Sequence, residues 1–151
     1  MLEQPSPKDK HINNEMPQVI IEHSKGLEEL QLHHDGEPKN TSILQRVCEE
    51  IWEQFASHPS VTGPETVRVR CICASASRIY GGPHDSSDRN NQSFAHATLL
   101  LLPCRSDETR QELAQIIMDT FQKYLTDCQS LSVRLDDIGQ PYLKVIKDGP
   151  F

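Results

Sequence analysis

The sequence predicts an α+β domain in which two βαβ units form a four-stranded mixed sheet with two helices on one face. Two amphipathic helical patterns each stand between two strand patterns, and a polar stretch rich in turn residues, 81–92, separates the two sets. Because a helical crossover joins parallel strands, each set contributes one parallel pair to the sheet. The expected strands are 18–23, 67–74, 94–102 and 131–135, and the expected helices begin at Ser42 and Ser106.

The chain is acidic and has the length of one domain. Its 151 residues carry a formal net charge of -7 and include 36% hydrophobic residues. A negative balance argues against general binding of nucleic acid or of an anionic membrane surface, so any cationic site must be local. No apolar run approaches the roughly 18–20 residues that span a membrane. We therefore expect neither a nucleic-acid partner nor a membrane partner.

The first strand follows a polar N-terminal segment. Residues 1–15 have little to bury, which predicts a disordered extension ahead of a domain over 16–151. They contain no apolar signal core and no arginine, so neither a secretory nor a transit peptide is supported, and we expect a cytoplasmic protein. In the strand 18–23, Val19, Ile21 and His23 point to one face of the sheet.

The first helix is expected to begin at Ser42, with Gln45 three residues later as in a capping box. A short turn of helix is also expected before it, over 27–32. The residue before a proline avoids the helical region, so the long helix should end before the His58-Pro59 pair. Apolar residues recur every four positions along it, namely Ile43, Val47, Ile51 and Phe55.

The second strand carries two arginines on one face. Arg68 and Arg70 alternate with apolar residues that point to the other face, namely Val67, Val69, Cys71 and Cys73. Arginines at positions i and i+2 of a strand form either a solvated edge or an anion site. The spacing alone leaves both interpretations open, and a solvated edge is the more frequent case.

The second half repeats the pattern with a clearer helix start. The third strand leads through Pro103-Cys104-Arg105-Ser106 into a helix with Ser106 as its N-cap and two acidic residues in its first turn. The strand 131–135 follows. After Gly139, a few apolar residues have no assigned element.

The cysteines and histidines show no metal-ligand spacing. There are five cysteines and seven histidines, with no C-x-x-C and no H-E-x-x-H, so no metal site is expected. Cys71 and Cys73 share one face of a strand, and Cys48 lies on a helix. We interpret the cysteines as buried thiols in a reducing compartment.

A plausible strand order brings the basic residues together. If the first strands of the two halves lie antiparallel at the centre, the strands have the order 2-1-3-4. The starts of strands 1 and 2 and the end of strand 3 then share one edge of the sheet. Pro17, Arg68, Arg70 and Arg105 converge there, and guanidinium groups bind carboxylates well.

Pro17 has two interpretations. Proline is tolerated at the first residue of a strand, because its missing N–H is not needed there. Alternatively, if translation began at Met16 and this residue were removed, Pro17 would carry a free secondary amine. Such amines titrate at about 8, and burial and nearby cations lower the pKa further, towards the range of a general base. Joined to Met16 by an amide, the nitrogen is not basic.

Four motifs resemble one family of enzymes. Residues 16–24, MPQVIIEHS, resemble the start of 5-carboxymethyl-2-hydroxymuconate isomerase, in the tautomerase superfamily. Val67-Arg68-Val69-Arg70 resembles the family's arginine-bearing second strand. Residues 94–99 are similar to its third strand, and 105–111 to the opening of its second helix. The resemblance covers about 16–135, with the elements in a compatible order.

The resemblance implies a homotrimer and an isomerase of aromatic catabolism that moves a proton within an unsaturated hydroxy-dicarboxylate or tricarboxylate. It implies that Pro17 is the base and that Arg68 and Arg105 hold substrate carboxylates, with Arg70 as a further candidate. Arginine supplies the charge stabilisation, so neither a metal nor an organic cofactor is needed. Residues 75–92 are longer than the family's corresponding stretch, so phenylpyruvate-type tautomerisation stays open.

A second class of function fits the same core pattern. In it, the chain is a non-catalytic trimeric anion-binding or scaffold protein that keeps the fold but has an acylated Pro17. The arginines favour anion binding in either case. The intact mass of the protein from its native source discriminates between the two classes.

Overall fold

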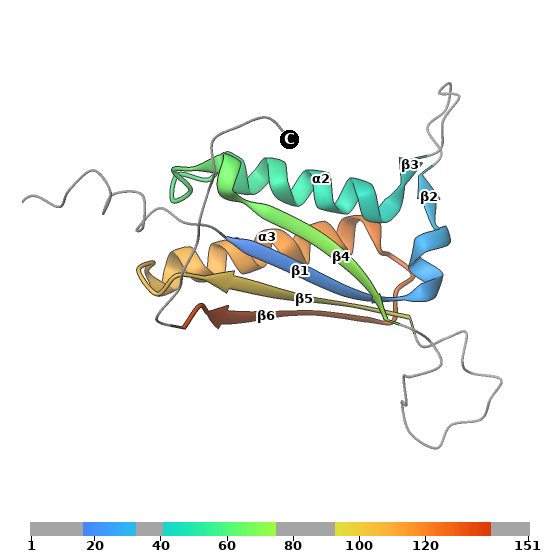
Figure 1. The fold of residues 1–151 in the computed structure, drawn as a ribbon. Helices are drawn as coiled ribbons and strands as arrows, with labels where there is room; N and C mark the ends of the chain where they lie inside the picture. Colours follow the sequence, from blue (N-terminus) through green and yellow to red (C-terminus); the bar gives the residue numbers. More distant parts are fainter. Residues whose placement is uncertain (1–16, 33–40, 75–92, 140–151) are drawn as a thin grey trace, which may run out of the picture.

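The computed structural model describes residues 17–32, 41–74 and 93–139 (Figure 1). Three segments discussed above lie outside these ranges, namely 1–15, 81–92 and the residues after Gly139. The first half contains β1 (Gln18–Ser24), η1 (Lys25–Glu29), β2 (Gln31–Leu32), β3 (Thr41–Ser42), α2 (Ile43–Ala56), η2 (Pro64–Thr66) and β4 (Arg68–Ala74). The second half contains β5 (Phe94–Leu101), α3 (Asp107–Tyr124) and β6 (Ser130–Asp137).

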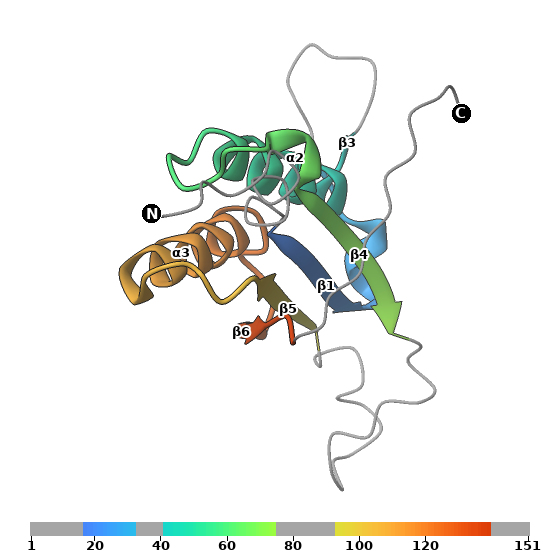
Figure 2. The same cartoon turned by 60° about the vertical axis from the view of Figure 1, so that its left-hand side comes forward.

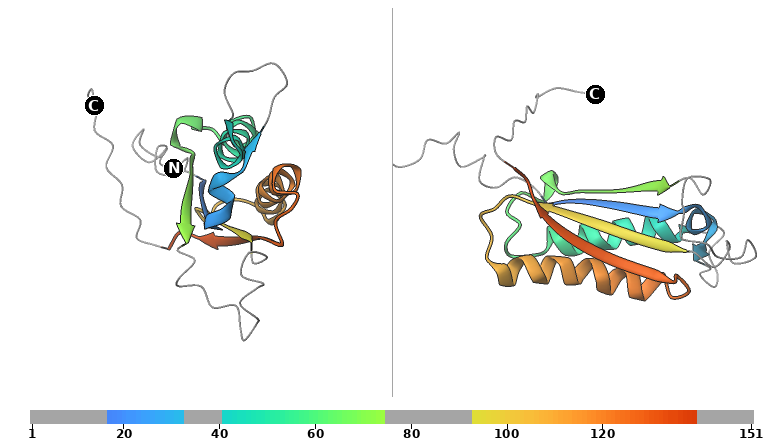
Figure 3. Two further views of the ribbon diagram at one scale, coloured as in Figure 1. Left: turned by 90° about the vertical axis from the view of Figure 1, so that its right-hand side faces the viewer. Right: turned by 90° about the horizontal axis from the view of Figure 1, so that it is seen from below.

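The main sheet has the order β4-β1-β5-β6, which is the order assumed above for the convergence of the basic residues. β1 pairs with β4 in parallel, β5 pairs with β6 in parallel, and β1 and β5 are antiparallel at the centre. Both helices lie on the same side of this sheet (Figures 2 and 3). The predicted α+β class, with two βαβ units and one helical layer, is confirmed.

The core lies between the helices and one face of the sheet. In β1, Val19 and Ile21 are fully buried, while the alternating Ile20 and Glu22 lie on the opposite face. Burial of apolar side chains is the largest favourable contribution to folding, so this alternation fixes the register of the central strands. The helices supply the other side of the core through fully buried Val47, Ile51, Phe55, Leu113, Ile117 and Phe121.

The opposite face of the sheet is covered by no described helix. It carries exposed apolar and basic side chains together: Ile72 is 47% exposed, and Arg68 and Arg70 are also exposed. In register across the strands, Arg70 lies beside Ile20, Ile20 beside Thr98, and Thr98 beside Arg134. The open face of the sheet thus carries Ile72 of β4 together with arginines of β4 and β6.

The two long helices begin differently. Ser106 caps α3, because its Oγ accepts a hydrogen bond from the Thr109 N–H at 3.2 Å. The capping box predicted at Ser42 is wrong: Ser42 makes no side-chain cap bond, and Gln45 Nε2 donates to Glu49 Oε1 at 3.0 Å instead. Ser42 also belongs to the short strand β3, so its backbone is fixed by pairing with Gln31.

Two other boundaries differ from the prediction. The expected helical turn over 27–32 is the 3₁₀ helix η1, which ends at Glu29 and gives way to the extended β2. The last strand is longer than 131–135, because β6 pairs with β5 along its whole length, from Ser130 to Asp137. Strand partners far away in the sequence thus extend an element that local composition defines only in part.

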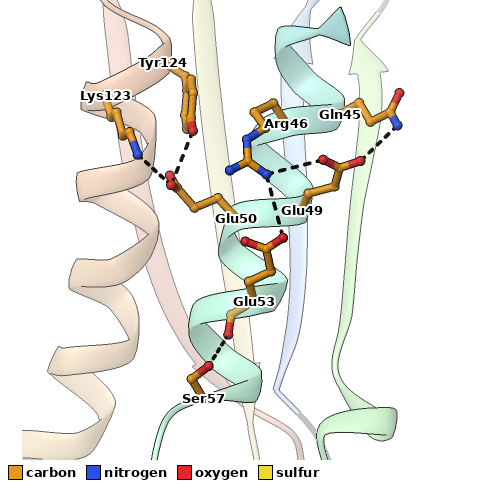
Figure 4. A network of polar contacts seen from close by, with 8 residues as sticks. All are labelled: Gln45, Arg46, Glu49, Glu50, Glu53, Ser57, Lys123 and Tyr124. Carbon is orange, nitrogen blue, oxygen red and sulfur yellow. Dashed lines mark hydrogen bonds and ion pairs between the residues drawn. The ribbon is translucent and has the colours of Figure 1, made fainter.

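A polar network joins the outer surfaces of the two helices (Figure 4). Glu50 of α2 accepts a hydrogen bond from Lys123 Nζ at 2.6 Å and from the Tyr124 hydroxyl at 3.3 Å, both on α3. Bonding to Glu50 raises the pKa of Lys123, so the ammonium form is favoured. Arg46 pairs with Glu49 and Glu53 along α2 itself. These contacts orient the helices and lie on the side of the helices away from the sheet.

Candidate functional site

Pro17 and Arg68 lie side by side at one edge of the sheet. Pro17 is buried just ahead of β1, and its carbonyl oxygen accepts a hydrogen bond from the Arg68 N–H at 3.3 Å. This bond continues the parallel ladder between β1 and β4, whose first registered pair is Gln18 and Arg68. The proline therefore keeps the strand pairing intact, as expected for the first residue of a strand.

Arg105 approaches the same edge from the second half. β5 runs antiparallel to β1, so its last residues lie next to the start of β1, with Leu100 opposite Gln18. Only residues 102–106 connect β5 to α3. The Cys104 N–H donates to the Leu102 carbonyl at 2.9 Å, which makes a tight turn. Arg105 is therefore held within a few residues of the strand end.

Arg105 is a cation with unfilled hydrogen-bonding capacity. Its Nε and Nη1 atoms are buried, and neither has a hydrogen-bond partner within the part of the chain that the structure describes. Burial lowers the pKa of Arg105, although a guanidinium stays protonated at any physiological pH. A buried donor without a partner is costly, and a buried unpaired charge is more so. An anion that bound here would remove that cost.

The other arginines at this edge already have partners. Arg68 Nη1 donates to the carbonyl oxygens of Glu65 and Val67, at 2.6 and 3.0 Å. Sequence reasoning assigned no role to Arg110, which lies in the first turn of α3 and pairs with Asp137 at the end of β6. Arg110 lies within the motif 105–111, and this motif is the sequence signal by which it could have been predicted. Arg110 is neutralised by its partner, whereas the buried Nε and Nη1 atoms of Arg105 have no hydrogen-bond partner in the described part of the chain.

Arg70 lies farther from Pro17 than Arg68 does. It is in register with Ile20, two residues along β1 from Gln18, and its side chain belongs to the open face of the sheet. Arg134 occupies the corresponding position on β6 and binds Asp136 of its own strand through two nitrogens, at 2.6 and 3.0 Å. The structure thus brings Pro17 and Arg68 into direct backbone contact and places Arg105 at the same edge of the sheet. Arg70 lies two residues further along β4 than Arg68.

The cysteines are less buried than the sequence suggested. None of the five takes part in a disulfide, and Cys73 and Cys104 are exposed while Cys48, Cys71 and Cys128 are half-buried. The interpretation of the cysteines as buried thiols is therefore wrong for Cys73 and Cys104, and the other three are only partly buried. Among residues 17–32, 41–74 and 93–139, no group of three or more His, Cys, Asp or Glu side chains is placed to hold a metal ion. No helix in those ranges is both long and apolar enough to cross a membrane.

The architecture defines a class of fold: two βαβ units joined antiparallel at the centre of one sheet, with both helices on one side. No protein-family model and no curated protein sequence matches the chain. Solved structures do match. A 5-carboxymethyl-2-hydroxymuconate delta-isomerase aligns with a TM-score of 0.63 and 15% identity, over 91% of this chain and 92% of that one.

Two further structures have the same fold. The 5-carboxymethyl-2-hydroxymuconate isomerase from Deinococcus radiodurans R1 aligns with a TM-score of 0.62 and 16% identity, over 89% of this chain and 92% of that one. Native fused 4-OT aligns with a TM-score of 0.61 and 17% identity, over 85% and 91%. At such identities the likeness shows the fold, and it confirms the fold that the sequence motifs implied.

One relative of the same fold is an oligomer. A fused 4-OT that forms a symmetric trimer aligns with a TM-score of 0.53 and 13% identity, over 85% of this chain and 90% of that one. The identity is again too low to carry more than the fold. The trimer is a property of that protein.

Proposed function

We propose that this chain is an isomerase or tautomerase that moves a proton within an unsaturated hydroxy-dicarboxylate or tricarboxylate of the 5-carboxymethyl-2-hydroxymuconate type. The proposal rests on the arrangement of three residues at one edge of the sheet. A buried Pro17 lies there beside the backbone of Arg68, and Arg105 offers two buried nitrogens without a described partner. A cation of this kind fits a substrate carboxylate, and the structural neighbours include isomerases of that substrate type.

In the proposed mechanism, Pro17 acts as the base after it becomes the amino terminus. Its secondary amine takes a proton from one carbon of the bound substrate and returns it to another. Arg105 and Arg68 hold the carboxylates and stabilise the negative charge that develops on the dienolate oxygen. Arg70 is a weaker candidate for carboxylate binding, because it lies on the open face of the sheet, two residues further along β4 than Arg68. The chemistry requires no metal and no organic cofactor.

The same proposal includes a homotrimer in the cytoplasm. The open face of the sheet supports an oligomer, since it exposes Ile72 and two arginines that no described helix covers. The lack of a disulfide among the five cysteines supports a reducing compartment. Sedimentation should show a trimer at micromolar concentration. A stable monomer there would remove this part of the proposal.

The decisive experiment compares two amino termini. A chain that begins at Pro17 should isomerise 2-hydroxymuconate-type substrates, whereas the 151-residue chain, with Pro17 joined to Met16, should be slower by about 10²–10⁴-fold. Intact mass must establish that the long chain remains unprocessed. In the short chain, Pro17→Ala should keep some activity with a shifted pH profile, because a primary amine remains. Equal activity of the unprocessed long chain would exclude Pro17 as the base.

A second candidate is anion binding without turnover. It is favoured by the amide bond between Met16 and Pro17 in the 151-residue chain, which leaves Arg105 available but provides no base. In that case the long chain should bind a dicarboxylate, Arg105→Ala should abolish this binding, and neither form of the chain should turn over an enol substrate.

A further inference from the structure

Cys48 of α2 and Cys71 of β4 lie in contact where the first helix covers the edge strand. Their Sγ atoms are 3.2 Å apart and hydrogen-bonded, although 23 residues separate them in the sequence. Both thiols are free and half-buried. A disulfide holds its sulfur atoms about 2.05 Å apart, so bond formation requires an approach of only about 1 Å.

An open groove gives access to this pair. The groove has a volume of about 310 Å³ and is lined by Cys48, Glu49, Trp52, Glu53 and Val69. Its wall includes Trp52, which is 40% exposed. The two acidic side chains at the groove pair with Arg46 at 3.5 and 3.8 Å, which reduces their charge without reversing it. Such an opening admits a small neutral reagent and disfavours an anionic one.

The two thiols are not equivalent. The hydrogen bond with Cys71 lowers the pKa of Cys48, against the opposing effects of burial and of Glu49. The same hydrogen bond, together with burial, raises the pKa of Cys71. The thiolate therefore forms on Cys48, the member of the pair that lines the groove. A thiolate, and not a thiol, is the nucleophile in cysteine chemistry.

We propose that Cys48 and Cys71 form an oxidisable dithiol site that reacts with a small neutral hydroperoxide and closes to an intramolecular disulfide. The Cys48 thiolate attacks one peroxide oxygen, the O–O bond breaks, and the departing oxygen takes up a proton, which leaves Cys48 as a sulfenic acid. Once Cys48 is a neutral sulfenic acid, its negative charge no longer raises the pKa of Cys71. The Cys71 thiol then loses its proton, its thiolate attacks the Cys48 sulfur, the S–O bond breaks, and the departing oxygen takes up a proton and leaves as water. The two thiols lose two electrons and two protons; an organic hydroperoxide is reduced to an alcohol and water, and hydrogen peroxide to two waters.

The disulfide ties α2 to the edge strand β4. It closes a loop of 23 residues, and a cross-link of this length should raise the Tm by about 6–12 °C in a chain of this size. Cys73 provides a matched control on the same strand. It is exposed, and its Sγ contacts the Ala74 carbonyl at 3.7 Å.

The experiment uses the reduced 151-residue chain and one equivalent of hydrogen peroxide. The expected product has lost two hydrogens by intact mass and yields a peptide in which Cys48 and Cys71 are cross-linked. Trp52 is the single tryptophan of the sequence and lies one helical turn from Cys48, so its emission should fall on oxidation and recover with dithiothreitol. Cys73→Ser should behave like the wild type, whereas Cys48→Ser and Cys71→Ser should show neither the cross-link nor the rise in Tm.

The proposal is wrong if Cys48 and Cys71 remain reduced while the exposed cysteines oxidise. It is equally wrong if Cys48 proceeds to a sulfinic acid while Cys71 stays a free thiol. Should either serine variant fail to fold, the peptide map of the oxidised wild-type chain decides the question by itself.

Discussion

The two βαβ halves have the same order of elements but connect them differently. In the first half, the chain passes through η1, β2 and β3 between β1 and α2, and α2 begins without a side-chain cap. In the second half, residues 102–106 alone join β5 to α3, and Ser106 caps the helix. The short connection holds Arg105 at the edge of the sheet. The hydrophobic core therefore tolerates either type of connection, whereas the candidate site includes a residue of the shorter one.

The largest effect on stability is expected from core substitutions, which test whether the two halves contribute equally to the hydrophobic core. Phe55 of α2 and Phe121 of α3 are both fully buried, so Phe55→Ala and Phe121→Ala should each lower the free energy of unfolding by about 3–5 kcal/mol. The measurement is the midpoint of urea unfolding, with the slope unchanged. A much smaller loss for one of them would show that its half contributes less to the core than burial indicates.

The next largest effect concerns turnover, and it should distinguish Arg105 of the second half from Arg68 of the first. In the chain that begins at Pro17, Arg105→Ala should lower turnover of a dicarboxylate enol by about 10- to 150-fold, because a charged hydrogen-bond partner is worth roughly 1.5–3 kcal/mol. Its free energy of unfolding should not fall, since the buried Nε and Nη1 atoms have no described partner to lose.

Arg68→Ala is the matched variant of the first half. Arg68 donates to two carbonyl oxygens of its own turn, so the variant loses these bonds as well as any contact with substrate. Steady-state kinetics and urea unfolding on both variants separate the two roles. Unchanged kinetics in a folded Arg105→Ala variant would remove Arg105 from the site.

A smaller effect compares the two helix starts. Ser106→Ala should cost about 1 kcal/mol, because the Thr109 N–H loses its acceptor. Ser42→Ala should change stability by less than about 0.5 kcal/mol, because the Ser42 side chain makes no cap bond. Thermal unfolding of both variants provides the measurement. Equal losses would mean that Ser42 caps α2 in solution.

The smallest effect concerns the surface ion pairs. Arg110 of α3 pairs with Asp137 of β6, and its side chain is 20% exposed, so Arg110→Ala should cost about 0.2–1 kcal/mol. Arg46 forms its ion pairs with Glu49 and Glu53 of α2, at the longer distances of 3.5 and 3.8 Å, and Arg46→Ala should cost less. Both losses should shrink when salt is raised to about 1 M, since the Debye length then falls to about 3 Å. A loss that is independent of salt would indicate packing rather than charge.

Local sequence was sufficient for the four long strands, the two long helices and their order along the chain, but not for β2, β3 and η2. The alternation in 18–23 and 67–74 and the four-residue spacing after Ser42 encode which side chains are buried, and burial defines strands and helices. Ser106 was recognised as a cap because capping depends on a hydrogen bond to a residue only three positions away. The parallel pairing within each half follows from crossover rules that apply to any βαβ unit, whereas the antiparallel pairing of β1 with β5 was an assumption that the structure confirms.

Tertiary structure decided the contacts between residues far apart in the sequence. Ser42 pairs with Gln31 because β3 lies beside β2, and Cys48 meets Cys71 because α2 packs on β4. The buried Nε and Nη1 atoms of Arg105 depend in the same way on chain segments that pack around the turn after β5. Periodicity records whether a side chain is buried, but not which atom it meets, because that partner is set only when distant segments pack together.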